Sequence, residues 1–408
     1  MKNNVMNHRI GLGGFRFGLA AIFAVLLVSL LAPHAFAVGF RLPNQDPEAI
    51  ARGNAFTATA DNPSAIYYNP AGITQLTQPE ISYGLYEISA HDEFESATPG
   101  EHGSTRNNFQ SVPQFYSVYP LKDYPITFGL GVYVPYGLSL DWGVNNPFTG
   151  VAENGSLLYA TVNPVIAWQI VSNLSIAIGP TLNYAKADFN RGPAPGQFHF
   201  VGDGFDAGFN AGLFWHPIPM FAFGLNYRYL DTMDFKGHAS SYPPDNAFPA
   251  SGTLRFPQYA VAGFSFRPTT NWNFEFDLDW TDWDNVNTIG FKAPLPQQPL
   301  NYRSSFMYEF GATRQLPHGY FVSAGYFYSE NSSPDQDFTP QIPDSALHLF
   351  SVGFGHKGVH WDWAASYTAA FNFGRTLTAA DGNIYGTPIE GTYRTMNNAI
   401  NVSVGYKF

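Results

Sequence analysis

The segment that decides the fold runs from Val38 to Leu76 and reads VGFRLPNQDPEAIARGNAFTATADNPSAIYYNPAGITQL. Four prolines interrupt it, at Pro43, Pro47, Pro63 and Pro70, and each removes a backbone donor that a β-sheet ladder needs. The small residues between them suit short, closely packed helical turns, and Pro47 and Pro63 can each occupy the first turn of a helix. We therefore predict a compact plug without strands, placed ahead of a large β structure.

The residues before this segment have the features of a secretory signal. Three basic residues and no acidic residue precede an apolar run, Leu19–Leu31, which is shorter than the roughly 20 residues of a spanning helix. Ala35-Phe36-Ala37 then supplies the small side chains expected at a cleavage site. An N-terminal membrane anchor is the alternative. We expect residues 1–37 to be removed on export.

The composition favours a chain that faces lipid. Charged residues make up 12% of the sequence and aromatic residues 17%, whereas soluble domains carry about 25% charged residues. An outer-membrane barrel shows this balance, because its outer face is apolar and bears aromatic girdles. Cysteine is absent, which excludes disulfides and cysteine metal sites. Loss of the three basic residues of the signal takes the net charge from −11 to −14, which argues against a nucleic-acid partner.

After Leu76 the chain reads as strands with a period of two residues. In the last strand, one face carries Ile400, Val402, Val404, Tyr406 and Phe408. A terminal Phe in such a strand resembles the signal that the barrel assembly machinery recognises. About fourteen segments of this kind alternate with short and long connections, as in even-stranded outer-membrane barrels; twelve and sixteen are the alternatives. The predicted fold is all-β, an antiparallel transmembrane β-barrel over residues 78–408.

We call the predicted plug, residues 38–77, the hatch, and two observations place it inside the barrel. A barrel of about fourteen strands would leak if its lumen were empty. In addition, one face of the segment Trp272–Trp280 carries Glu275, Asp277 and Asp279, and charges are too costly to face hydrocarbon. We expect these acids to be solvated in the lumen or to pair with Arg52 of the hatch.

Short motifs along the chain resemble those of the FadL/TodX family of long-chain fatty acid and hydrocarbon transporters (OMPP1/FadL/TodX). They are Ala51–Ala55 (ARGNA), Ala60–Ala65 (ADNPSA), Asn69–Gly72 (NPAG), Val132–Leu138 (VYVPYGL) and Ile342–Asp344 (IPD). The resemblance implies a barrel in the outer membrane of a Gram-negative bacterium that passively imports hydrophobic molecules, with no cofactor and no enzymatic activity. It also implies capture at the outer surface, rearrangement of the hatch, and lateral release at a kink in the third strand.

The resemblance implies candidate site residues as well. The kink that would form the lateral gate falls at Pro135, Tyr136 and Gly137, although a proline that merely ends the strand is the alternative. Strict alternation would place Tyr136 on the same face as Phe128. The candidate residues of the hatch are Phe40, Arg52, Gly53, Asn69, Pro70 and Ala71.

The cargo is not specified by the sequence. A fatty acid needs a cationic contact for its head group, and Arg228 and Arg303, both inward by alternation, are candidates; pairing with a lumen acid is the alternative.

His356 and His360 lie in a strand–turn–strand region, so we expect no metal site there. A general diffusion porin and an outer-membrane enzyme or adhesion barrel remain alternative functions. The expected partners are hydrophobic small molecules, outer-membrane lipid, lipopolysaccharide and the assembly machinery, and the expected state is a monomer.

Overall fold

The computed structural model describes residues 39–106, 108–192, 198–241, 247–292, 295 and 297–408. The predicted signal, residues 1–37, and Val38 at the predicted start of the hatch lie outside the described residues. Within the described ranges, no helix has the length and apolar character needed to cross a bilayer.

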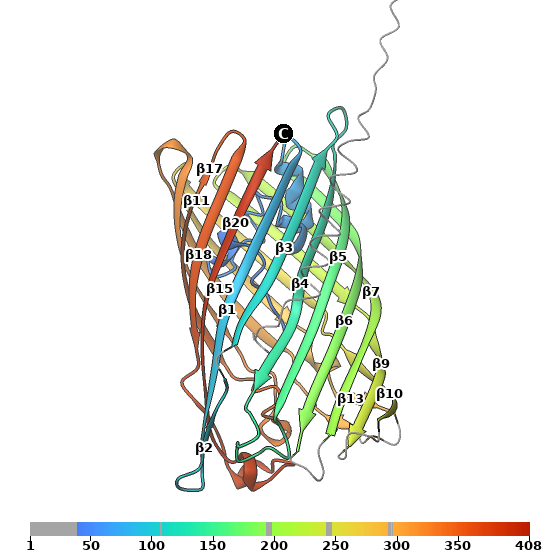
Figure 1. The fold of residues 1–408 in the computed structure, drawn as a ribbon. Helices are drawn as coiled ribbons and strands as arrows, with labels where there is room; N and C mark the ends of the chain where they lie inside the picture. Colours follow the sequence, from blue (N-terminus) through green and yellow to red (C-terminus); the bar gives the residue numbers. More distant parts are fainter. Residues whose placement is uncertain (1–38, 107, 193–197, 242–246, 293–294, 296) are drawn as a thin grey trace, which may run out of the picture.

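The described chain forms a closed antiparallel barrel of fourteen strands (Figure 1), and this confirms the predicted fold and strand number. Eleven strands are single segments: β1 (Glu80–Ser96), β3 (Asn108–Pro120), β4 (Ile126–Asp141), β5 (Asn154–Val171), β6 (Leu174–Arg191), β7 (Phe198–Ile218), β15 (Ser305–Gln315), β16 (Tyr320–Ser329), β17 (Leu347–Lys357), β18 (Trp361–Phe371) and β20 (Gly391–Lys407). Pairing of β1 with β20 closes the barrel.

The other three barrel strands are each interrupted once. They are β8 (Phe221–Leu230) with β9 (Thr232–Ser241), β10 (Phe248–Arg255) with β11 (Tyr259–Thr269), and β12 (Trp272–Thr281) with β13 (Thr288–Phe291). The remaining short elements lie in the connections: β2 (His102–Ser104), β14 (Gln298–Pro299), β19 (Arg375–Leu377), η3 (Trp283–Asn285), η4 (Pro317–Gly319), η5 (Asp335–Asp337), η6 (Ala379–Asp381) and η7 (Thr387–Ile389).

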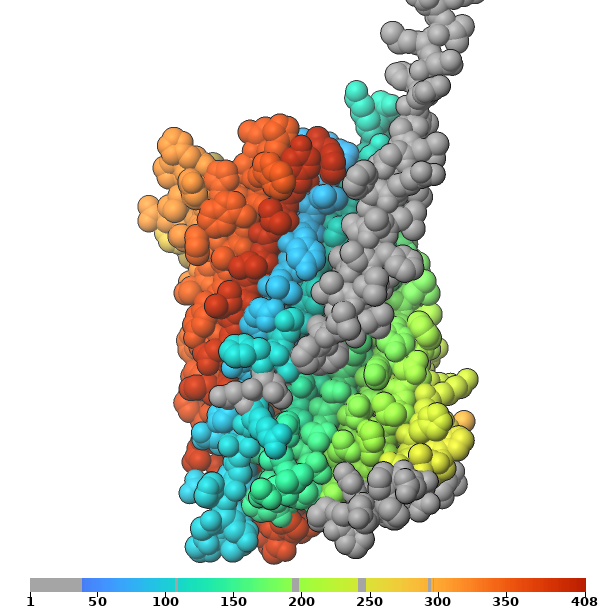
Figure 2. All heavy atoms as spheres, in the orientation of Figure 1, coloured from blue at the N-terminus to red at the C-terminus, as the bar shows by residue number. Residues whose placement is uncertain are grey.

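The alternating pattern of the strands separates an apolar outer face from a mixed inner face. In β20, Val402 is 46% exposed on the outer face, whereas its neighbour Asn401 is fully buried on the inner face. The outer side chains of β1, β18 and β20 are in view in Figure 2. Short turns gather at the rim that carries the C-terminus, at the top of Figure 1, and longer connections gather at the opposite rim. We call these the turn rim and the loop rim.

The hatch lies inside the barrel near the turn rim (Figure 1). It contains α2 (Pro47–Ile50), α3 (Ala65–Tyr68) and η1 (Pro70–Gln75). One side-chain oxygen of Asp46 caps α2 by accepting the backbone N–H groups of Glu48 and Ala49 at 3.0 and 3.3 Å, and Pro47 occupies the first turn, as predicted. Every residue from Gly39 to Ala60 is buried.

Candidate functional site: the hatch, the wall opening and the apolar cluster

The ladder between the second and third barrel strands is incomplete. Pairing of β3 with β4 runs only from Phe115 with Val132 to Pro120 with Thr127. The remaining residues of β3, 108–114, pair with β1 on their other side. The barrel wall therefore has an interrupted seam between β3 and β4 in the half nearer the loop rim, and we call this seam the wall opening.

A bulge in β4 lies beside the wall opening. Tyr133 pairs with Thr161 of β5, and Tyr136 pairs with Tyr159. Two residues of β4, Val134 and Pro135, therefore lie opposite the single residue Ala160 of β5. An extra residue of this kind bends a strand and increases its twist. The kink predicted at Pro135 thus coincides with an irregularity of the wall; its role as a gate stays a proposal.

The bulge also inverts the faces of β4. Phe128 is 46% exposed on the outer face, whereas Tyr136 is fully buried and its hydroxyl donates to the Pro257 carbonyl at 2.7 Å. The expectation that these two side chains share a face was wrong, because one additional residue shifts the two-residue period by one position.

The first residues of the hatch complete the ladder of β4 where β3 does not. The Leu42 N–H donates to the Pro135 carbonyl at 2.8 Å, and the Gly137 N–H donates to the Phe40 carbonyl at 2.9 Å. Arg41 lies opposite Tyr136 as an antiparallel bridge. The short extended segment Phe40–Leu42 thereby covers part of the wall opening from inside.

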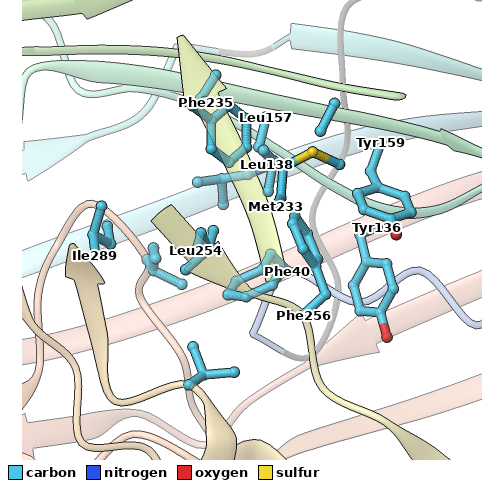
Figure 3. Close-up of a cluster of buried hydrophobic side chains, with 14 of the residues drawn as sticks. Phe40, Tyr136, Leu138, Leu157, Tyr159, Met233, Phe235, Leu254, Phe256 and Ile289 are labelled. Atoms are coloured by element: carbon cyan, nitrogen blue, oxygen red, sulfur yellow. The ribbon is translucent and has the colours of Figure 1, made fainter. Parts of the chain in front are cut away.

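A large apolar cluster fills the lumen beside this segment (Figure 3). The Phe40 ring packs edge-on against Trp283 and Phe256, with ring centroids 5.0 and 5.6 Å apart, and lies 6.1 Å from Tyr136. The buried members of the apolar cluster are Phe40, Tyr136, Leu138, Leu157, Tyr159, Ala185, Ala187, Phe200, Leu230, Met233, Phe235, Ala239, Leu254, Phe256, Trp283, Val286, Ile289, Phe291, Leu300, Tyr302 and Ile342.

The acids of β12 are buried partners of the hatch, not solvated lumen charges. Arg52 donates to Glu275 at 3.0 Å, which is the second of the two arrangements expected for these acids. The Asp277 carboxylate accepts the backbone N–H groups of Phe56 and Thr57 at 3.0 and 2.8 Å. Because these groups are withdrawn from water, removal of one partner leaves an uncompensated buried charge, which costs about 3–5 kcal/mol.

Sequence reasoning missed two residues that fix the start of the hatch. Arg41 binds Asp279 at 2.7 Å, and its guanidinium lies 3.7 Å from the ring centre of Tyr259. Asp344, in the connection between β16 and β17, accepts the backbone N–H of Gly39 at 3.1 Å. Burial raises the pKa of Asp344. Asp344 belongs to the motif Ile342–Asp344 noted in the sequence, but the sequence did not show that Gly39 is its partner.

The remaining hatch candidates lie where the backbone approaches the barrel wall. Gly53 has a positive φ of 63°, and its N–H donates to the Ser351 hydroxyl at 3.1 Å. The Asn69 side chain accepts the Ala71 N–H at 3.2 Å, as the cap before Pro70. Its amide also donates to the Thr57 and Leu213 carbonyls, at 2.8 and 2.9 Å.

Arg228 points into the lumen, as predicted. It is fully buried, and none of its guanidinium nitrogens has a hydrogen-bond partner among the described residues. The guanidinium carbon lies 5.2, 5.4 and 5.9 Å from the ring centres of Tyr133, Tyr67 and Tyr259, respectively. The Arg228 guanidinium is therefore a buried positive charge beside the hatch, with three tyrosine rings around it.

The predicted inward position of Arg303 on a strand was wrong. The residue precedes β15, which begins at Ser305, and its side chain is exposed near the loop rim. Asn301 has a positive φ of 45°, which interrupts the strand alternation just before Arg303. Arg303 lines an open hollow of about 400 Å³ together with Asp335.

Within the described ranges, no group of three or more His, Asp or Glu side chains is arranged to hold a metal ion.

Sequence comparison relates this chain to transport proteins. A family model described as outer membrane protein transport protein (OMPP1/FadL/TodX) matches residues 28–408. The long-chain fatty acid transport protein of Salmonella typhi is 23% identical over 377 residues, which cover 80% of this chain and 85% of that protein. The 47 kDa outer membrane protein of Pasteurella multocida is 25% identical over 373 residues, which cover 81% and 86%.

Structural comparison agrees on the fold. A FadL homologue of Pseudomonas aeruginosa matches with a TM-score of 0.80 and 17% identity, covering 91% of this chain and all of that chain. The toluene transporter TodX of P. putida matches with a TM-score of 0.68 and 15% identity, covering 90% and 99%. Since the family model spans the hatch and every barrel strand, this chain belongs to the OMPP1/FadL/TodX family of outer-membrane transport proteins.

Proposed function

We propose that this outer-membrane protein passively transports hydrophobic molecules, either long-chain fatty acids or aromatic and aliphatic hydrocarbons, and releases them sideways between β3 and β4. The relatives described above are named for long-chain fatty acids and for toluene. The observation that carries the proposal is the incomplete ladder between β3 and β4, which lies beside the apolar cluster and is bridged by Phe40–Leu42 of the hatch.

The energetics of apolar solutes favour such a path. Returning each CH₂ group to water costs about 0.8 kcal/mol, so a chain of about sixteen carbons would meet a barrier near 12 kcal/mol on entering an aqueous periplasm. An exit into the bilayer avoids most of this barrier. A path that begins in the apolar cluster and ends at the wall opening keeps the solute away from water throughout.

In this mechanism, Phe40 connects the apolar cluster to the gate. A molecule captured at the loop rim enters the apolar cluster and displaces the Phe40 ring from Trp283. The Phe40 carbonyl is hydrogen-bonded to the Gly137 N–H, and the Leu42 N–H to the Pro135 carbonyl. Displacement of the Phe40 ring therefore pulls the hatch away from β4. Release of these bonds uncovers the wall opening.

The two arginines serve different steps for a substrate that carries a carboxylate. Arg303 is exposed near the loop rim, and in this proposal it meets the head group during capture. Arg228 is covered by Tyr67 of the hatch, so it becomes accessible only after the hatch has moved. An uncompensated buried guanidinium favours an anionic group, since a charge-assisted pair offsets its lost hydration. A hydrocarbon uses neither residue.

Uptake measured in cells tests the proposed function. Labelled palmitate and labelled toluene are offered to a strain without its own hydrophobic transporters, with and without this protein at the surface. Uptake of at least one substrate should rise with expression, while purified protein in a planar bilayer should conduct little current. Large steady conductance without hydrophobic uptake would indicate a diffusion porin, and lipid hydrolysis in detergent micelles would indicate an enzyme.

We expect a monomer that the barrel assembly machinery inserts beside lipopolysaccharide.

A further inference from the structure

We infer that Tyr302 is the polar contact of the apolar cluster and that its hydroxyl binds one uncharged oxygen of an aromatic substrate, as in a phenol. The inference rests on the proposed function, which brings substrate into the apolar cluster, and it narrows the class of substrate. Three features carry it: the free hydroxyl of Tyr302, the edge-on packing of the rings beside it, and the absence of charge among the described buried members of the apolar cluster.

The three tyrosines of the apolar cluster differ in the hydrogen bonds of their hydroxyls. Tyr136 donates to the Pro257 carbonyl at 2.7 Å, and Tyr159 donates to the Asp206 carboxylate at 3.0 Å. Tyr302 is only 2% exposed, yet its hydroxyl has no hydrogen-bond partner among the described residues. A buried hydroxyl is nearly always bonded, because its lost hydration is costly unless another group replaces it. Of these three hydroxyls, that of Tyr302 is therefore the one free to bond a substrate.

The backbone just before Tyr302 fixes the position of its ring. The backbone N–H groups of Leu300 and Asn301 both donate to the Asn287 carbonyl, at 2.8 and 3.0 Å. The Tyr302 ring packs against Trp283, with ring centroids 5.8 Å apart. Because these contacts keep the two rings together, a substrate that packs against Trp283 lies next to Tyr302.

The Tyr302 hydroxyl, in the connection before β15, acts as a hydrogen-bond donor. Burial, and after it the charge of Asp344, raises the pKa of this hydroxyl well above its ordinary value. The hydroxyl therefore keeps its proton, and a substrate oxygen with a lone pair satisfies it. A hydrogen bond between the two replaces the bonds to water that both groups lose on burial.

The apolar cluster favours a planar ring over an alkyl chain. Phe40 meets Trp283 and Phe256 edge-on, with interplanar angles of 89° and 84°. Tyr136 meets Tyr159 at 73°. In such contacts the positive edge of one ring lies against the negative face of another, which an alkyl chain cannot reproduce. Nine of the 21 buried members are aromatic, so a substrate ring can make edge contacts in several directions.

The apolar cluster also favours an uncharged substrate. Its described buried members carry no charged side chain, and Asp206, which binds Tyr159, adds a carboxylate at its boundary. A hydroxyl donor compensates a neutral oxygen for its lost hydration, whereas a carboxylate loses far more hydration than one such bond returns. The charge of Asp206 opposes a second anion as well. A hydrocarbon such as toluene uses the rings alone, and an aromatic molecule with one uncharged oxygen uses Tyr302 in addition.

Three probes that share a methyl-substituted ring test the inference. Opposite that methyl group, p-xylene carries a second methyl, p-cresol a hydroxyl and p-toluate a carboxylate. Binding of each labelled probe to the purified protein is measured by equilibrium dialysis in detergent, with binding to micelles alone subtracted. Tyr302→Phe removes only the hydroxyl in question. We expect it to weaken binding of p-cresol by about fivefold or more and to leave binding of p-xylene within about twofold. On the unmodified protein, p-toluate should bind about tenfold or more weakly than p-cresol.

Tyr367→Phe is the matched control. It also removes one tyrosine hydroxyl, but Tyr367 is 46% exposed on the outer face of β18, and its hydroxyl donates to the Asn398 side chain at 2.7 Å. The control should bind all three probes as the unmodified protein does. Both variants are compared as folded barrels, identified by their heat-dependent gel mobility.

Unchanged binding of p-cresol by folded Tyr302→Phe would overturn the inference. Equal losses for p-cresol and p-xylene would overturn it as well, because they would show that Tyr302 only supports the shape of the cluster. Binding of p-toluate as tight as that of p-cresol would overturn the restriction to an uncharged oxygen. Absence of binding of all three probes to the unmodified protein would contradict the proposed function itself, so the two failures are distinguishable.

Discussion

Replacement of Gly325 by alanine should unseat the hatch without altering the lipid-facing wall. The new Cβ atom would lie 2.0 Å from the Gly53 nitrogen, whereas ordinary contacts begin near 3.4 Å, so the hatch backbone at Gly53 must withdraw by about 1.4 Å, the difference between the two. A shift of that size would disturb the 3.1 Å hydrogen bond from the Gly53 N–H to the Ser351 hydroxyl. Overpacking of this kind costs about 1–3 kcal/mol, which would lower the ratio of closed to open hatch by about 5- to 160-fold.

Planar-bilayer conductance and antibiotic susceptibility of expressing cells measure the effect of Gly325→Ala. Both should rise, while the heat-dependent gel mobility of the folded barrel is retained. Gly103→Ala is the matched control, because the nearest atom to its added Cβ is 3.6 Å away. A folded Gly325→Ala protein with the conductance of the parent would refute the argument that Gly325 lets the hatch lie directly on the barrel wall.

Three further substitutions separate the roles of individual residues. Asn69→Ala removes the cap before Pro70, worth about 1 kcal/mol, and should lower hydrophobic uptake while barrel folding persists; normal uptake would exclude Asn69 as a pivot of the gate. Burial and the neighbouring Glu48 raise the pKa of Asp46 from 3.8 to about 7. Since the closed hatch then holds a proton that a solvated carboxyl has lost, its stability should fall as pH rises between these two values; conductance should increase from pH 5 to pH 8, and Asp46→Asn should remove the dependence. Arg228→Met should reduce palmitate uptake and spare toluene uptake, and equal losses for both substrates would indicate a structural role instead.

The fold could be predicted because its signals are local. Alternation of apolar and polar residues identifies each strand within about ten residues, and prolines mark the hatch as a segment that cannot join the sheet. The pairing of Arg52 with an acid of β12 could also be predicted, since a charge in a lipid-enclosed lumen needs a partner.

The wall opening depends on long-range register that the sequence does not display. Pro113 is the one local sign in β3 of an edge without a partner, but it does not show that the whole of residues 108–114 lacks a partner in β4. The bulge at Val134 and Pro135 inverts the face of every later residue in β4. The contact of Gly39 with Asp344 joins residues 305 positions apart. Such contacts arise from the closed barrel as a whole and have no local pattern.

Lateral exit at the wall opening is tested most directly by deleting Pro135. The deletion leaves Tyr133, Val134 and Tyr136 opposite Thr161–Tyr159 in regular register, and it keeps the flanking side chains on their present faces. A straightened β4 can then pair with the free part of β3. Deletion of Pro217, which removes a bulge of the same kind opposite Ala222, is the matched control.

Uptake of labelled palmitate and toluene is compared at equal surface expression of the folded barrels. The account predicts that deletion of Pro135 lowers uptake by about tenfold or more, while deletion of Pro217 leaves it unchanged. Undiminished uptake by the folded Pro135 deletion would contradict lateral exit between β3 and β4 and would place the exit past the hatch into the periplasm.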